Sequence, residues 1–259
     1  MIIKCIQDYA DIISNLKKPI ESFNERPLPE SLLLERNSSI EIYYAPFDYV
    51  TPTARVVIVG ITPGRTQALL ALNKTAESLA AGKSPEQASM IAKSFASFGG
   101  SMRNNLVRML DCIGLHQHLG LTSTMELFTS RTDLAHFTSA LQYPTFLGGT
   151  DYNGAPSMIS HPMLRDYLET YMRWQLTKLP SDVLFLPLGP KPTEALQHLV
   201  NSGDIASNAI LEGLPHPSGA NAERVAVFIG SKSPADASIK TNAPRLIAAR
   251  ERLSRQLAS

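Results

Sequence analysis

Cysteine is scarce in this sequence, and long apolar runs are absent. The 259 residues include two cysteines, Cys5 and Cys112, which do not lie at metal-ligand spacing from each other. We therefore expect no disulfide framework, no bound metal and no other cofactor. No stretch of about 18 apolar residues occurs, and the segment after Met1 turns polar too early for a secretory signal. These absences predict a cytoplasmic protein that does not bind a membrane.

A dominant charge of one sign is also lacking. The chain carries 24 Lys+Arg against 23 Asp+Glu, which gives a formal net charge of +1. No global field therefore indicates a polyanionic partner. The exception is the segment 223–259, where seven basic residues stand against three acidic ones, a local charge of +4. A solvated basic helix and a local nucleic-acid contact both explain this excess.

The composition that remains is globular, with 44% hydrophobic and 18% charged residues. Apolar runs predict strands at 55–60, 135–141, 183–188 and 209–214. Helical patterns cover 2–23, 66–82, 85–96, 105–113, 164–179, 192–200, 222–229 and 243–257. Strands that alternate with helices predict a three-layer α/β/α sandwich with a mainly parallel central sheet of about four strands. We expect a single domain over 1–259, with its core at 55–230 and helical extensions at both ends.

Two unusual loops follow predicted strands, at 60–66 and 215–221. Ligands of such sheets bind outside the carboxyl ends of the strands, so we expect these loops to be halves of one site. In the first loop, Pro63 stands between two glycines that allow close backbone approach, and the following helix can offer its amides to an anion. In the second loop, His216 can offer a proton or a neutral hydrogen bond to developing negative charge. A loop histidine bonded only to backbone is the alternative.

Together the two loops resemble the signature motifs of the uracil-DNA glycosylase superfamily. The first reads Gly60-Ile-Thr-Pro-Gly64 and the second His216-Pro-Ser-Gly-Ala-Asn221. The segment 98–115 and the strand with its glycine at 184–189 are similar to further parts of the family core, so the resemblance covers about 55–230. It implies a monofunctional DNA glycosylase, a hydrolase that flips a nucleotide from the duplex and cleaves its N-glycosidic bond. DNA is then the partner, and no obligate protein partner is expected.

The resemblance also implies a role for each matching residue. His216 stabilises the departing base anion, and Thr62 orients the water, although a hydroxyl is a poor base. Phe98 stacks on the extruded base, with core packing as the alternative. The other residues expected in the base pocket are Ile61, Ser139, Asp151 and Asn153. The expected phosphate contacts are Pro63, Gly64, Arg65, Ser218, Gly219 and Asn221.

Departures from the family pattern leave the target base open. Ser139 stands where the family usually carries a uracil-reading asparagine, and Ala220 replaces the bulky residue that often enters the duplex. The cysteines of the iron–sulfur branches are missing. A housekeeping uracil-excising repair enzyme, a non-catalytic DNA-binding module with this fold, and an unrelated α/β enzyme for a small phosphorylated ligand are therefore alternatives.

Two long segments suggest a larger pocket. Between Gly64 and Phe98 lie 33 residues, and the glycine-rich stretch 148–154 contains Asp151 and Asn153. These two side chains can hydrogen-bond a polar substituent such as a sugar, with a solvated turn as the alternative. We therefore expect a bulky modified pyrimidine as the target, such as a hypermodified cytosine of phage DNA, and a role in antiviral defence rather than DNA repair.

Overall fold

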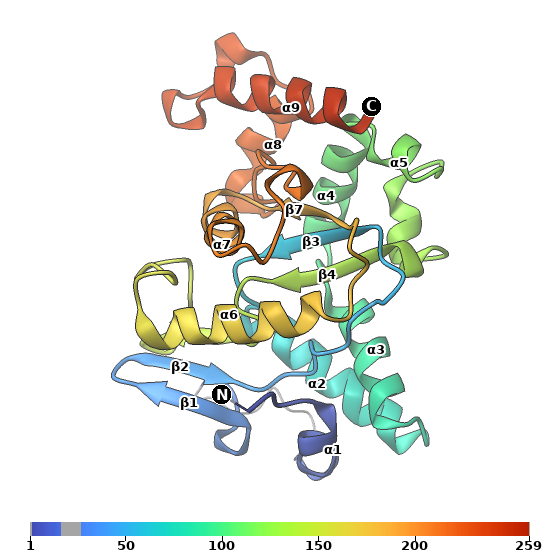
Figure 1. Ribbon diagram of the computed structural model, residues 1–259, viewed down its shortest axis with the longest axis vertical. Coiled ribbons are helices and arrows are strands. Elements are labelled where there is room, and N and C mark those ends of the chain that lie inside the picture. The colour runs from blue at the N-terminus through green and yellow to red at the C-terminus, as the bar shows by residue number, and fades with distance from the viewer. Residues whose placement is uncertain (1, 17–26, 259) are drawn as a thin grey trace. The chain divides into compact units, whose positions relative to one another are not determined.

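The computed structural model describes residues 2–16 and 27–258 (Figure 1). The chain forms two compact units, each made of three segments. Unit 1 comprises Met1–Val50, Ile61–Ser97 and Phe137–Lys178, and unit 2 comprises Thr51–Gly60, Phe98–His136 and Leu179–Ser259. None of the described helices is long and apolar enough to cross a membrane. The single-domain organisation stays a prediction.

One sheet has the strand order β4-β3-β7 and confirms the predicted α/β class. β3 (Val56–Gly60) and β7 (Leu184–Pro187) pair in parallel, and all five residues of β3 are buried. Such a continuous apolar run is typical of a parallel strand that is covered on both faces. β4 (Ala135–Ser139) coincides with the second predicted strand, at 135–141.

The prediction of a fourth strand at 209–214 is wrong, because this segment does not form a regular strand. This segment makes two isolated parallel bridges to the chain of β7, Phe185 with Ile210 and Leu188 with Leu214. Gly213 interrupts it with φ +121°, and a side chain there would lie 2.7 Å from Cβ of Ala249. The C-terminal helix therefore packs closely against this segment, which lies just before the second loop and makes only isolated bridges.

Helices and short 3-10 turns make up most of the remainder of unit 2. The predicted helices at 105–113, 192–200, 222–229 and 243–257 are all present. The helices of unit 2 are α4 (Ser101–Cys112), α5 (Leu115–His118), α7 (Pro190–Asn201), α8 (Ala222–Phe228) and α9 (Ala243–Ala258). The 3-10 turns are η3 (Thr124–Phe128), η4 (Thr132–Leu134), η5 (Ser207–Ala209), η6 (Gly219–Asn221), η7 (Pro234–Asp236) and η8 (Ile239–Thr241).

Unit 1 contains an antiparallel sheet that the sequence did not predict. Its strands are β1 (Leu33–Asn37), β2 (Ile40–Tyr43), β5 (Thr145–Leu147) and β6 (Thr150–Asp151), in the order β1-β2-β5-β6. Gly148 and Gly149 join β5 to β6 with φ +56° and +79°. Positive φ at both central residues is the requirement of a type I′ hairpin turn, for which two glycines are well suited. The glycine-rich stretch is thus a tight hairpin at this point.

The helices of unit 1 agree with the predicted pattern. They are α1 (Ile6–Ser14), α2 (Arg65–Ala80), α3 (Pro85–Ala96) and α6 (Pro162–Leu176), with a 3-10 turn, η2, at Glu30–Leu32. Helices α2 and α3 occupy most of the 33 residues between the first loop and Phe98. The part of the predicted N-terminal helix that falls on residues 17–23 lies outside the described residues.

Two buried ionisable side chains, Asp48 and Lys93, tie three segments of unit 1 together. Asp48 accepts hydrogen bonds from the N–H of Ile6 (2.9 Å) and the hydroxyl of Tyr44 (2.8 Å). The Nζ of Lys93 donates to the carbonyls of Phe47 (2.8 Å) and Tyr49 (2.6 Å). Burial raises the pKa of Asp48 and lowers the pKa of Lys93 to about 7, and the charge of Asp48 opposes part of the lysine shift.

Candidate active site

The first loop leaves β3 at Gly60 and leads into α2. Ile61 accepts a hydrogen bond at its carbonyl from the N–H of Leu141 (2.9 Å). The Thr62 hydroxyl donates to the carbonyl of Tyr143 (2.8 Å) and accepts from the N–H of Thr145 (3.1 Å). A hydroxyl has one proton and two lone pairs, so Thr62 can offer a water only its second lone pair. Its hydroxyl therefore holds the loop to the start of β5, and it cannot act as a base in this state.

The β5–β6 hairpin brings Asp151 to the start of α2. The Asp151 carboxylate accepts a hydrogen bond from the N–H of Arg65 at 2.8 Å. Its other oxygen lies where a side chain on residue 64 would be, because a Cβ on Gly64 would come within 2.7 Å of Oδ2. A carboxylate at this position is favoured by the unpaired amides and positive end of the helix. A side chain at 64 would therefore displace the Asp151 carboxylate from this position.

Side chains of unit 1 already occupy the amides that we predicted to bind phosphate. The N–H of Gly64 donates to Oε1 of Gln67 (3.3 Å), and Asp151 holds the N–H of Arg65. The Arg65 guanidinium donates from Nε to the carbonyl of Pro27 (2.9 Å). Pro63 is buried and has no amide hydrogen. Phosphate binding by these amides requires Gln67 and Asp151 to withdraw.

Two further predicted pocket residues lie in unit 1. Ser139 is half-buried and is the last residue of β4. Asn153 is exposed, and its Oδ1 accepts from the N–H of Ala155 at 3.3 Å. Unit 1 brings Asp151 to the start of α2. The Asn153 side chain bonds instead within its own turn, to Ala155. Their roles in base recognition stay predictions.

The second loop, in unit 2, holds His216 in a defined tautomer. The N–H of Ser218 donates to Nδ1 of His216 at 3.3 Å, so Nδ1 accepts and carries no proton. A neutral imidazole then carries its proton on Nε2. The ring is half-buried, and desolvation lowers the pKa of His216 below its usual value. The loop thus presents a neutral histidine with Nε2–H as its hydrogen-bond donor.

Two residues from other elements position the His216 loop. Gly189, at the end of β7, donates from its N–H to the carbonyl of Leu214 (2.9 Å). Its φ of +95° and ψ of 179° belong to a region that is essentially restricted to glycine. Asn105 of α4 donates from Nδ2 to the carbonyl of Pro217 at 2.9 Å. No sequence pattern indicates this role of Asn105, because its partner lies 112 residues away.

A hydrogen-bond relay continues from the second loop into α8. Nδ2 of Asn221 donates to Oγ of Ser218 at 3.1 Å, and Oδ1 of Asn221 accepts from Arg224 at 2.8 Å. Gly219 is exposed at the start of η6. Three of the expected phosphate contacts, Ser218, Gly219 and Asn221, therefore lie along one short segment. The side chains of Ser218 and Asn221 are hydrogen-bonded to each other.

Phe98 is buried and has an unusual backbone. It is 8% exposed and has φ +49°, in the left-handed region that favours glycine. Strain of this kind costs free energy and concentrates at functional sites. Burial fits both core packing and a ring that lines a pocket, so base stacking by Phe98 stays a prediction.

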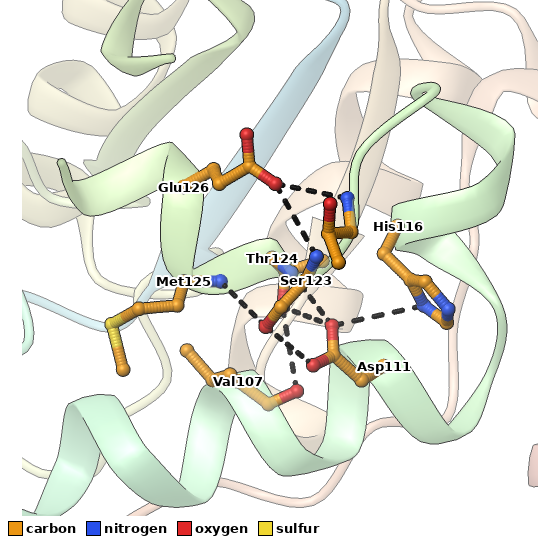
Figure 2. A network of polar contacts seen from close by, with 8 residues as sticks. Val107, Asp111, His116, Ser123, Thr124, Met125 and Glu126 are labelled. Atoms are coloured by element: carbon orange, nitrogen blue, oxygen red, sulfur yellow. Dashed lines mark hydrogen bonds and ion pairs between the residues drawn. The ribbon is translucent and has the colours of Figure 1, made fainter. Parts of the chain in front are cut away.

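A second polar cluster in unit 2 contains an aspartate, a histidine and a serine, yet it is structural (Figure 2). Asp111 accepts from Oγ of Ser123 (2.7 Å), from the N–H of Thr124 (2.7 Å) and from Oγ1 of Thr124 (2.8 Å). Nδ1 of His116 lies 3.7 Å from Asp111. Nucleophilic catalysis requires the serine to donate to the histidine, whereas Ser123 donates to the carboxylate. The cluster therefore caps η3 and fastens it to α4.

No group of three or more metal-ligating side chains capable of holding an ion occurs within residues 2–16 and 27–258. Both cysteines are free thiols.

These features define an α/β protein with a parallel sheet, a loop between β3 and α2, and a second loop that holds a neutral histidine. The chain belongs to the uracil DNA glycosylase superfamily, whose sequence model matches residues 47–235. A Bacillus subtilis (strain 168) protein with the printed name "Uncharacterized protein YoxB" is 33% identical over 239 residues, which are 92% of this chain and 93% of that protein. No solved structure matches this chain. Membership supports a DNA glycosylase-like function with DNA as the substrate.

Proposed function

We propose that this protein is a monofunctional DNA glycosylase that hydrolyses the N-glycosidic bond of a flipped, modified pyrimidine. The observation that carries the proposal is the neutral tautomer of His216, with Nδ1 bound to the Ser218 amide and the proton on Nε2. No lysine stands in either loop, so a Schiff-base lyase step is not expected.

His216 stabilises the leaving base. As the bond between C1′ and the base nitrogen breaks, its electron pair moves onto the base, and the sugar becomes cationic. Nε2–H of His216 donates to the carbonyl oxygen of the base, where negative charge develops. This hydrogen bond strengthens in the transition state and therefore accelerates the reaction rather than merely binding the substrate. The lowered pKa keeps the imidazole neutral, so no proton transfer from an imidazolium is needed.

Water completes the reaction. Its oxygen bonds to C1′, one of its protons leaves to solvent, and the base takes up a proton to become the free base. Thr62 orients this water through the one lone pair that Tyr143 and Thr145 leave available. A cationic sugar reacts with a weakly activated water, so a strong base at Thr62 is not required.

Loop residues hold the DNA backbone and set the register. Ser218, Gly219 and Asn221 contact phosphates on the side of the second loop, and Gly64 and Arg65 on the side of the first. Asp151 competes with phosphate for the Arg65 amide, because both are anions that seek the helix N-terminus. Phosphate contact at the first loop therefore involves a move of Asp151.

The finer proposal concerns the substrate. A bulky modified pyrimidine, such as a hypermodified cytosine of phage DNA, fits a site without the uracil-reading asparagine at Ser139, and implies antiviral defence. Asp151, once released from Arg65, and Asn153 supply the acceptors and donors for a sugar substituent. Excision of plain uracil in a housekeeping repair role is the alternative for this same site.

A panel of duplexes tests the proposal. Each duplex carries uracil, another damaged base or glucosylated hydroxymethylcytosine, and abasic sites are detected by alkaline cleavage. We expect product from at least one modified pyrimidine and a loss of about 10²–10³-fold in His216→Ala. His198→Ala, in α7 outside both loops, is the matched control with wild-type activity. Absence of abasic product across the panel overturns the enzymatic proposal.

The same panel separates the other functions. Tight binding to abasic DNA without turnover, unchanged in His216→Ala, indicates a DNA-binding module. Competition by mononucleotides together with indifference to duplex DNA indicates an enzyme for small phosphorylated ligands.

A further inference from the structure

Ile239 is the most exposed large apolar side chain among the described residues. It is 99% exposed, compared with 77% for Ile2, 52% for Phe95 and 41% for Met90. Single exposed apolar residues are common on protein surfaces and by themselves indicate nothing. Ile239 differs in that the backbone on both sides of it is held by hydrogen bonds.

Glu223 is the anchor of this segment. Its carboxylate accepts from the N–H of Ser238 (3.2 Å) and from the hydroxyls of Ser238 and Thr241, one residue before and two residues after Ile239. Lys232 adds an ion pair of 2.6 Å to the same carboxylate. These donors hold the pKa of Glu223 well below its usual range, so the anchor stays charged at all ordinary pH values. The turn η8 therefore presents Ile239 outward from a fixed base.

The same turn is connected to the His216 loop. Arg224 donates from NH2 to the carbonyl of Lys240 (3.2 Å) and from NH1 to Asn221 (2.8 Å). Asn221 in turn donates to Ser218, whose N–H binds His216. A continuous series of side-chain and backbone contacts thus runs from the residue after Ile239 to the proposed catalytic histidine, all within unit 2.

The chemistry around Ile239 favours DNA as the surface that covers it. Lys240 is adjacent and Arg224 is bonded to it, whereas the carboxylate of Glu223 is neutralised by Lys232. The exposed Asp236 is the other acid of this segment, so basic residues are in slight excess. An apolar tip next to this excess of positive charge matches a DNA duplex, which offers phosphates at the outside and base faces at the centre. Apolar side chains inserted between base steps are a general device for distorting a duplex.

We propose that Ile239 is the side chain that enters the base stack when the target nucleotide is extruded. The inference rests on the proposed function and adds the residue that supports the duplex during base flipping. The side chain of Ala220 is too small to fill this role. An extruded nucleotide leaves a gap in the stack, and an isoleucine on a turn fixed in advance fills that gap with little loss of conformational entropy.

Binding to a duplex with a tetrahydrofuran abasic analogue tests the inference without excision. A 2-aminopurine beside the analogue reports unstacking by its fluorescence. We expect Ile239→Ala to bind this duplex about tenfold more weakly and to lose most of the fluorescence change, and Ile239→Leu to retain both. Ile2→Ala, the same truncation at another exposed isoleucine, should match wild type. The melting temperature of Ile239→Ala should also match wild type, because the side chain is 99% exposed.

A second readout separates this inference from the proposed function. On a base that the wild type excises, Ile239→Ala should lose activity on duplex substrate and keep it on single-stranded substrate. Two results would overturn the role of Ile239 and leave the glycosylase proposal standing. One is an equal loss of activity on the duplex and on the single-stranded substrate. The other is no loss of activity on either substrate, together with a wild-type fluorescence change. A wild type that binds the analogue duplex and unstacks 2-aminopurine but excises nothing contradicts the glycosylase proposal alone. If Ile239→Ala changes only the oligomeric state in sedimentation, the residue contacts a second copy and the inference is wrong.

Discussion

The side-chain amide of Asn105 donates a hydrogen bond to the backbone carbonyl of Pro217, at 2.9 Å. Asn105 lies on α4, and Pro217 follows directly after His216. The contact fixes the carbonyl at the centre of the second loop, whose neighbouring amide, that of Ser218, sets the tautomer of the histidine. We therefore expect Asn105 to be a positioning residue, which would act on the proposed reaction through the loop.

Replacing Asn105 by alanine should weaken excision more than it weakens the fold. Loss of one hydrogen bond costs about 1 kcal/mol of unfolding free energy. A displaced Nε2–H loses part of its transition-state interaction, so we expect kcat to fall about tenfold with little change in KM. Steady-state kinetics on the excised base and a urea titration measure the two effects. Asn104→Ala, at the exposed neighbouring position on α4, is the control and should leave both unchanged.

Gly64 and Asp151 should show a strong coupling in a double-mutant cycle. Gly64→Ala places a methyl group within 2.7 Å of the Asp151 carboxylate and forces that carboxylate off the Arg65 amide. We expect a loss of about 1–2 kcal/mol, and a much smaller loss when Asp151→Ala is already present. Denaturant unfolding of the four proteins gives the coupling energy. Gly99→Ala is the control, because no atom lies within 4 Å of its added Cβ. Additive effects of the two substitutions would contradict the contact.

The sequence predicts two strands of the parallel sheet well because they are buried apolar runs. β3 and β7 have no polar side chain over their lengths and are therefore recognisable without any partner. The antiparallel sheet of unit 1 was not predicted because its strands are short and partly exposed. β6 has two exposed residues, and β1 ends in the exposed residues Glu-Arg-Asn. The Gly148-Gly149 pair was the one available signal, since paired glycines favour a hairpin turn.

The candidate site is predictable only where its residues are contiguous in sequence. The loop around His216 is recognisable from its motif. The contacts that position it, and those that occupy the first loop, join residues 112 positions apart for Asn105 with Pro217 and 86 apart for Arg65 with Asp151. Such pairs depend on how helices and hairpins pack, and neither partner is unusual in its own sequence context.

His216 should remain neutral at pH values at which an ordinary histidine is half protonated. Burial lowers its pKa below 6.5, because the charged imidazolium is the form that loses solvation. A two-dimensional NMR titration of the imidazole, assigned by comparison with His216→Gln, should give a midpoint below 6.5. Excision should keep its full rate down to the same pH, since only the neutral form has the required tautomer. A midpoint at or above 6.5 would contradict both expectations.

Lys93 should make the stability of the protein depend on pH above neutrality. Its pKa is about 7 in the folded state and about 10.4 when unfolded, so between these values the unfolded chain binds more protons. The unfolding free energy therefore rises with pH in this window, by up to about 1.4 kcal/mol per pH unit, and below about pH 7 the buried charge destabilises the fold fully.

Lys93→Met removes this dependence. Measured by denaturant unfolding between about pH 7 and 9, the wild type should gain stability relative to the variant, whereas Lys83→Met, at an exposed lysine, should follow the wild-type curve. Asp48 keeps its two donors, Ile6 and Tyr44, in the variant. Comparing slopes rather than absolute stabilities therefore isolates the titration of Lys93 from the loss of its hydrogen bonds. Parallel curves for wild type and Lys93→Met would show that the lysine stays charged in the folded protein.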